Sequence, residues 1–135
     1  MPQRIIGILG GMGPEATCAL FQRIIDCTGA KCDREHIRII IDNNPQIPDR
    51  TAAILNKGTS PVPELVKTAL NLEKAGVDFI VIPCITSHYF IDDIQKEIKI
   101  PIINALEITR DYIDNELPHL KKIGVIATTG TIKSG

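Results

Sequence analysis

The sequence predicts an α/β protein with a doubly wound parallel sheet flanked by helices. Three observations support this prediction. Short apolar runs rich in Ile and Val are typical of strands buried on both faces. Segments of helical periodicity alternate with those runs, and turns rich in Gly or Pro separate them. The 135 residues are 44% hydrophobic and 23% charged, so we expect one folded unit with a packed core.

Each expected element has a local signal. The first strand, at 4–9, ends in a glycine-rich turn, and Pro14 suits the first turn of a helix that Gly29 ends. The later elements alternate in the same way. We expect strands at 37–42, 78–82, 101–103 and 122–127, and helices directly after Asp49 and at 64–75, 88–97 and 106–117. Ligands of such sheets bind at the carboxyl ends of the strands. The loops that begin at Gly10, Asn43, Pro83 and Thr128 are therefore the candidate site.

Charge and composition exclude several classes of partner. Fifteen Lys and Arg against sixteen Asp and Glu give a net charge of −1, and aromatic residues make up only 4%, so we expect no nucleic-acid partner. No apolar run approaches the roughly 20 residues of a membrane span, and the short apolar N-terminal stretch does not resemble a signal peptide. We therefore expect no membrane partner and a cytoplasmic location. There the four cysteines would stay free, and their spacing fits no zinc site.

Two segments share one pattern. Residues 6–13 and 123–130 both read Ile-Gly-apolar-apolar-small-x-x-Gly. The match reflects either ordinary strand chemistry or an internal repeat. A repeat would divide the chain into a first domain, 1–118, and the start of a second, 119–135, without the helix that should follow Thr131.

The first turn allows two interpretations. Gly11-x-Gly13-x-x-Ala16 follows a strand and precedes a helix, as in dinucleotide-binding proteins. However, Asp42 lies further along the chain than the roughly 20 residues expected for a ribose-binding acid. The alternative is a glycine turn that binds a smaller anion at the helix N-terminus.

The loop after the third strand carries the strongest chemical signal. Cys84 ends a buried strand just before a helix, whose positive end favours the thiolate form. Thr86 and Ser87 offer hydroxyls and N–H groups to an anionic oxygen. The alternative is a buried structural cysteine. We interpret His88 as a residue that orients this loop, because one Cys and one His are too few for a metal site.

Two further loops supply anion-binding groups. The guanidinium of Arg50 suits a substrate carboxylate, although the alternative is a surface pair with Asp49. The turn at 128–131 is rich in small hydrogen-bond donors and is either an anion-binding turn or a plain polar turn.

Together these motifs resemble the aspartate/glutamate racemase family, especially its aspartate-racemase branch. The matching segments are GGMGP at 10–14, NNPQIPDR at 43–50, PC-x-T-x-H at 83–88 and ATTGT at 127–131. The resemblance implies an isomerase that needs no cofactor and has two similar α/β halves. Its active site would lie between the halves, with one catalytic cysteine from each.

The resemblance also assigns roles to individual residues. Cys84 matches the first catalytic cysteine, and Arg50 matches the arginine that faces the substrate's side-chain carboxylate. The remaining matches line the substrate: Gly11, Met12, Thr86, Ser87, Thr128, Thr129 and Thr131. No metal is implied, and the substrate would be aspartate or a similar acidic amino acid.

Two departures from the family pattern qualify this assignment. Ile85 stands where the family usually has Asn after the cysteine, and Cys18, Cys27 and Cys32 do not match the second catalytic cysteine. We therefore expect a truncated racemase, inactive alone, that forms a homodimer or otherwise self-associates. The alternative is a non-catalytic module that binds a small dicarboxylate or a dinucleotide.

Overall fold

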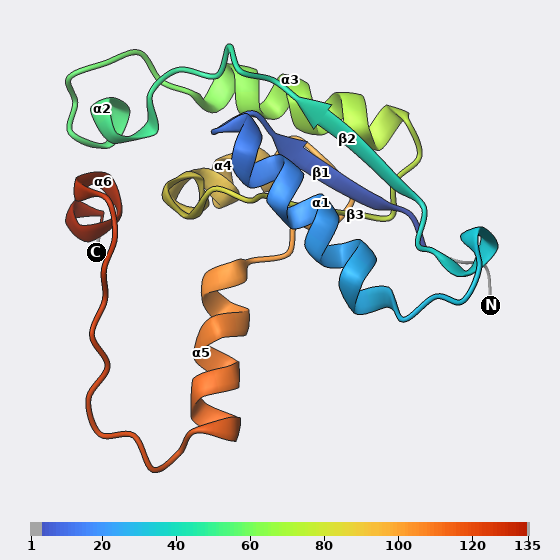
Figure 1. Ribbon diagram of the computed structural model, residues 1–135. Coiled ribbons are helices and arrows are strands. Elements are labelled where there is room, and N and C mark those ends of the chain that lie inside the picture. The colour runs from blue at the N-terminus through green and yellow to red at the C-terminus, as the bar shows by residue number, and fades with distance from the viewer. Residues whose placement is uncertain (1–3, 135) are drawn as a thin grey trace.

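A three-stranded parallel sheet forms the centre of the molecule in the computed structural model, which describes residues 4–134 (Figure 1). Strand β1 (Ile6–Gly10) lies between β2 (Ile39–Asn43) and β3 (Phe79–Val81). The register pairs Gly10 with Asn43 and Ile8 with Val81. The three strands therefore end at the same edge, and the expected α/β fold class is confirmed.

Helices cover both faces of this sheet. Helix α1 (Pro14–Thr28) lies on one face, while α3 (Val62–Lys74) and α4 (Ile91–Gln95) pack together on the other (Figure 1). The α3 side chains that face the core recur at helical spacing: Leu65, Thr68, Ala69 and Leu72. They meet strand residues such as Ile80, which is fully buried. Each large apolar side chain buried in this way stabilises the fold by about 1.5–3 kcal/mol.

The predicted helix at 88–97 has a different form. It begins earlier, as the 3₁₀ segment η2 (Ile85–Phe90), and continues as α4. Four of the six η2 residues are buried, including His88. Three residues per turn point successive side chains in directions about 120° apart, so consecutive residues reach different neighbours.

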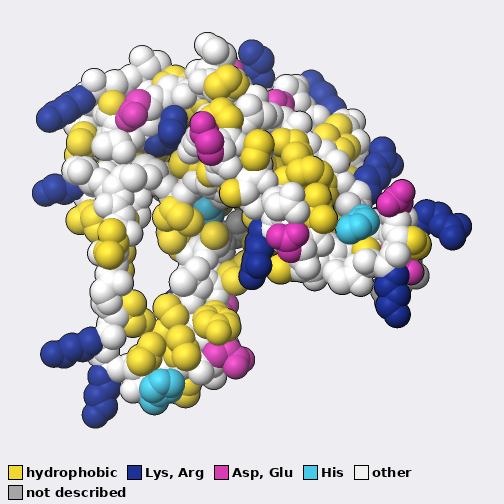
Figure 2. All heavy atoms as spheres, viewed as in Figure 1, with side chains coloured by type: hydrophobic (Ala, Val, Ile, Leu, Met, Phe, Trp, Pro, Cys, Tyr) yellow, Lys and Arg dark blue, Asp and Glu magenta, His cyan; other side chains and the backbone are white. Residues whose placement is uncertain are grey.

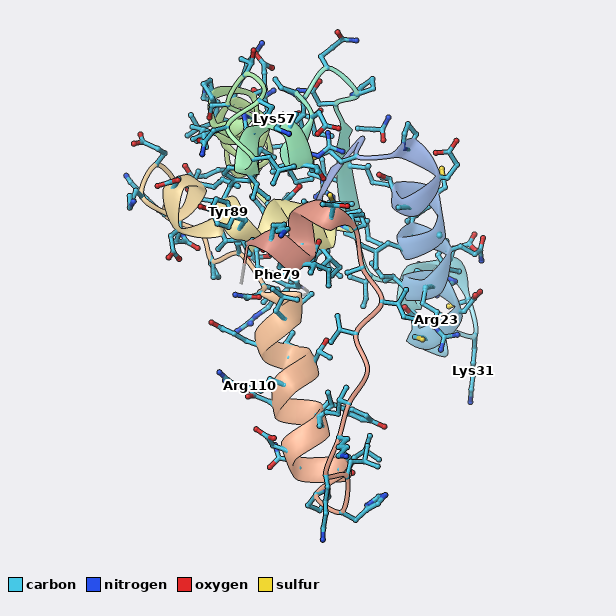
Figure 3. All side chains as sticks on the ribbon, turned by 90° about the vertical axis from the view of Figure 1, so that its left-hand side faces the viewer. Arg23, Lys31, Lys57, Phe79, Tyr89 and Arg110 are labelled. Carbon is cyan, nitrogen blue, oxygen red and sulfur yellow. The ribbon has the colours of Figure 1, made fainter. Side chains whose placement is uncertain are left out.

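The remaining helices are short or peripheral. They are η1 (Asp33–Glu35), α2 (Arg50–Ile54), α5 (Ala105–Glu116) and α6 (Thr129–Lys133). Asp49 caps α2 as predicted, because its carboxylate accepts the Ala52 N–H at 2.6 Å. Figure 3 shows α5, which carries Arg110, extending away from the sheet. No helix of the described residues is both long and apolar enough to cross a membrane.

The predicted strand at 101–103 is reduced to one bridge. Ile102 pairs with Ile80, whose N–H donates to the Pro101 carbonyl at 2.9 Å and whose carbonyl accepts the Ile103 N–H at 2.8 Å. Pro101 has no N–H, so the ladder cannot extend through it.

The prediction of a strand at 122–127 is wrong for the described residues. This segment runs from α5 to α6 apart from the sheet (Figure 1) and forms no ladder within residues 4–134. A strand needs a partner, and the β3 edge is already bridged by Ile102. The expected absence of a helix here is also wrong, since Thr128 caps α6.

The turn after β1 depends on the absence of a side chain at Gly11. Its φ is +101°, and a Cβ there would overlap the backbone of Asn44. The Asn44 N–H donates to the Gly10 carbonyl at 3.2 Å, which holds the two loops together. The loops after β1 and β2 are therefore packed backbone against backbone.

We expect Gly11→Ala to lower the free energy of unfolding by about 2 kcal/mol or more, because it adds both strain and overlap. Gly29→Ala is the matched control: its φ is also positive, at 64°, but nothing lies within 4 Å of an added Cβ. That control should cost about 1 kcal/mol. Urea unfolding followed by circular dichroism measures both, and equal losses would contradict the packing argument.

Large apolar side chains are exposed around α5 and the segment that follows it. Figure 2 shows them gathered there, beside an opening between that segment and the rest of the molecule. They are Leu106, Ile108, Tyr112, Leu120, Ile123, Val125 and Ile126. Clustered exposed apolar surface of this kind marks an interaction site.

We expect the chain to self-associate through this surface. Its apparent mass in analytical ultracentrifugation should rise with concentration, and Val125→Asp combined with Ile126→Asp should lower it. Phe21→Asp, at an exposed residue of α1, is the control. A strictly monomeric, folded species at all concentrations would contradict the expectation.

Candidate active site

One pocket collects loops from the carboxyl edge of the sheet and from the end of the chain. It encloses about 550 Å³, within the usual size of small-molecule sites. Its lining is contributed by Met12, Asp49, Arg50, Thr51, Pro83, Cys84, Ile85, Thr86, Leu106, Val125, Ile126, Ala127, Thr128 and Thr131. Six of the nine residues that the sequence predicts for the site are part of this lining.

Met12 enters the pocket from the glycine turn after β1. Ser87 lies behind it, fully buried, and its hydroxyl donates to the Met12 sulfur at 3.1 Å. Ser87 is outside the pocket lining, and its hydroxyl supports Met12. Gly11 is also outside the lining, and it packs closely against the backbone of Asn44.

The first amide of the glycine turn is hydrogen-bonded within the protein. The Gly11 N–H donates to the Thr17 hydroxyl at 3.0 Å, and that hydroxyl lies 3.3 Å from the Gly13 carbonyl. Asp42 accepts a hydrogen bond from the Asn71 side chain at 3.2 Å. The Gly11 amide and one carboxylate oxygen of Asp42 therefore already have partners in the protein.

Arg50 begins α2 and faces the same pocket. Its Nη1 donates to the carbonyls of Ile47 and Pro48, at 3.3 and 3.1 Å, which fixes the guanidinium. Its Nε is buried and has no hydrogen-bond partner within the described residues. Asp49 is occupied by the α2 cap, and Arg50 forms no ion pair among residues 4–134. Because Arg50 lines the pocket and its charge has no ion-pair partner among the described residues, its guanidinium suits a ligand carboxylate.

Cys84 lies at the junction of β3 and η2, half-buried in the pocket wall. Its carbonyl accepts the Ser87 N–H at 3.1 Å and lies 3.0 Å from His88 Nδ1. These contacts fix the backbone that carries the thiol. The other cysteines (Cys18, Cys27 and Cys32) are free and exposed and lie outside this pocket.

Three threonines of the pocket lining have hydroxyls that contact one another. Thr86 Oγ1 lies 3.0 Å from the hydroxyls of both Thr128 and Thr131, which are 3.1 Å from each other. This triangle joins η2 to α6. Thr129, although expected at the site, lies outside the lining.

Sequence reasoning missed part of this lining. Thr51 is adjacent to Arg50, and a Cβ on Gly130 would come within 2.5 Å of its hydroxyl, so α2 and α6 approach closely there. Leu106 and the 125–127 segment give the pocket an apolar side. Only the proximity of Thr51 to Arg50 was visible in the sequence, because the rest depends on where α5 and α6 lie.

No cluster of three metal-binding side chains is present among residues 4–134. His88 is the histidine nearest to Cys84 in the sequence. Both of its ring nitrogens contact protein groups instead of being open to a metal. The pocket therefore presents a thiol, a guanidinium and hydroxyls, which are groups suited to a small anionic molecule and to proton transfer.

The comparisons agree with this architecture: a family model described as Asp/Glu/Hydantoin racemase matches residues 9–135, so the chain belongs to that family. It is 35% identical to the broad specificity amino-acid racemase RacX of Bacillus subtilis, over 96% of this chain and 57% of that protein.

Solved structures give the same result. The aspartate racemase of Picrophilus torridus aligns with 98% of this chain and 55% of its own, with a TM-score of 0.85 and 32% identity. An aspartate racemase homologue from Pyrococcus horikoshii covers 84% of this chain and 50% of its own, with a TM-score of 0.70 and 23% identity, and supports the fold alone. The chain thus spans a little over half the length of the first two relatives.

The threonine triangle gives a test of how α6 is held. Thr86→Val keeps the shape of the side chain but removes the hydroxyl shared by Thr128 and Thr131. We expect the amides of α6 to exchange with deuterium about fivefold faster, the effect of one lost hydrogen bond. Thr59→Val, at an exposed loop residue, is the control. Unchanged exchange in α6 would show that the triangle does not hold it.

Proposed function

We propose that this chain forms one half of the active site of a cofactor-independent amino-acid racemase. In this proposal Cys84 exchanges a proton with the substrate Cα. The observation that carries the proposal is the single pocket that brings the Cys84 thiol together with Arg50 and the threonine hydroxyls. Membership of the racemase family and the similarity to RacX support it.

The chemistry follows from the groups present. A thiolate at Cys84 removes the Cα proton from one face and becomes a thiol, and the electron pair stays on Cα. A second acid then donates a proton to the opposite face, and the two groups exchange roles in the reverse direction. Hydrogen-bond donors around the α-carboxylate stabilise the carbanion. Thr86, Thr128 and Thr131 would fill this role when a hydroxyl of their triangle turns its hydrogen to the carboxylate.

We propose an acidic amino acid, such as aspartate, as substrate. Arg50 carries this part of the proposal, because it lines the pocket without an ion-pair partner among residues 4–134 while its Nη1 is held by backbone carbonyls. A guanidinium fixed in this way suits a second carboxylate.

The second proton-transfer group would belong to the part of the relatives that this chain does not match. Within residues 4–134, Cys84 is the one cysteine that lines the pocket. We propose that residues 1–118 form the first racemase-type domain and that 119–135 begin the second. Free cysteines also suit a reducing compartment, and we propose a cytoplasmic enzyme.

Exchange of the Cα hydrogen of aspartate in D₂O tests the proposal. In a polypeptide that carries this chain at the length of its relatives, NMR should detect deuterium at Cα. Cys84→Ala should slow that exchange by about 10²–10⁴-fold, the usual contribution of a general acid or base.

Cys18→Ala, which changes an exposed cysteine of α1, is the matched control and should retain the rate. Aspartate that binds without exchange would favour the non-catalytic dicarboxylate module. Exchange that survives Cys84→Ala would remove Cys84 from the reaction.

A further inference from the structure

We propose that His88 is a positioning residue that fixes Cys84 relative to α5, through a neutral ring with its proton on Nδ1. The inference rests on the proposed role of Cys84, but three of its tests are independent of racemase activity. Its basis is a pair of contacts made by one buried imidazole.

The two ring nitrogens of His88 contact different segments. Nδ1 lies 3.0 Å from the Cys84 carbonyl, and Nε2 lies 3.1 Å from the backbone nitrogen of Ala105. The side chain is only 6% exposed, so water has little access to replace either contact. The ring therefore bridges the cysteine loop and the first residue of α5.

These contacts determine the position of the proton. A backbone N–H only donates, so Nε2 accepts from Ala105 and carries no hydrogen. A carbonyl only accepts, so Nδ1 carries the hydrogen and donates it to Cys84. The neutral Nδ1–H tautomer satisfies both contacts, whereas the Nε2–H tautomer satisfies neither.

The bridge also completes the start of α5. The Asn104 side chain accepts from the N–H groups of Leu106 and Glu107, at 3.0 and 3.4 Å. Ala105 holds the remaining N–H of that turn, and His88 accepts it. The first N–H groups of a helix have no partner within the helix, so His88 acts as a second cap.

The consequence for the pocket is geometric. Cys84 and Leu106 lie in its lining, and His88 joins the backbone of Cys84 to the residue before Leu106. Both nitrogens of His88 are occupied, and the ring is outside the lining, so it does not meet the substrate itself. Its effect on the reaction would act through the position of the Cys84 thiol.

The first test uses the unaltered chain. ¹⁵N NMR of the imidazole nitrogens should show one fixed neutral form for His88, with hydrogen on Nδ1 and none on Nε2. The exposed His119 provides the reference, and we expect an averaged signal for it. A protonated Nε2 or an averaged signal at His88 would overturn the proposal, and no variant has to fold for this result.

Two substitutions separate the two halves of the bridge. His88→Asn places an amide donor near the position of Nδ1 but has no acceptor in reach of Ala105. His88→Gln places an acceptor near the position of Nε2 but has no donor at Nδ1. We expect His88→Asn to speed deuterium exchange at the Ala105 amide about fivefold, and His88→Gln to leave it nearly unchanged.

The alkylation rate of the Cys84 thiol should respond to the two substitutions in the opposite way from the Ala105 amide. His88→Gln should speed iodoacetamide alkylation of Cys84 about fivefold, because the loop loses one of two contacts to its carbonyl, while His88→Asn should retain the rate. Cys18, Cys27 and Cys32 serve as internal references in the same digest. Ile94→Val, at a fully buried α4 residue, controls for general loss of stability.

Equal effects of both variants, or an effect of Ile94→Val as large as theirs, would overturn the positioning role. If catalytic exchange is present, His88→Gln should lower kcat with little change in KM, because Arg50 is untouched. If no exchange occurs but the tautomer and alkylation follow the expected pattern, the proposed function fails and the positioning of Cys84 stands.

Discussion

Three consecutive side chains of the 3₁₀ segment η2 hold the pocket together. Thr86 contacts Thr128 and Thr131 of the C-terminal turn, Ser87 donates to Met12 of the β1 turn, and His88 reaches the start of α5. Each contact is close to 3 Å. Since three residues per turn send successive side chains about 120° apart, one short segment can hold three others in three directions.

The position of Cys84 follows from this arrangement. It precedes η2, and its carbonyl contacts both the Ser87 N–H and His88 Nδ1. The backbone of the cysteine is therefore tied to the residues that hold the neighbouring loops. A small displacement of a reacting group is costly in proton transfer, because geometry decides whether the proton can move. Thr86, Ser87 and His88 are all buried.

The sequence predicted the features whose causes are local. Pro14 and Gly29 set the ends of α1, and Asp49 caps α2. The strand predicted at 122–127 failed for a reason that local pattern does not contain: a strand requires a partner, and pairing is set by the tertiary fold. The amino-acid pattern of that segment is strand-like, but its large apolar side chains are mostly exposed to solvent.

The candidate site likewise contains residues that the sequence motifs predicted and residues whose position depends on the tertiary fold. The motifs placed Met12, Arg50 and Cys84 in loops that the parallel sheet brings to one edge, and the pocket contains all three. The inward direction of Ser87 was not predictable, because its burial depends on the 3₁₀ form of η2. The apolar side made by Leu106 and the 125–127 segment was also missed, since it depends on the path of the chain after 104.

The apolar side bears on how the proposed reaction would proceed. Proton transfer at Cα is favoured in a site that excludes water, because fixed donors stabilise a developing charge more strongly there. Here Val125 and Ile126 line the pocket yet remain largely exposed, so this wall faces water on its outer side. Arg50 and Cys84, in contrast, are anchored by contacts with backbone or ring groups of the chain itself. In the proposed racemase, recognition of the carboxylate and one proton-transfer group would thus be preorganised in this half. Exclusion of water would require further residues to cover the segment at 125–127, which makes the covering of that apolar wall a condition for catalysis.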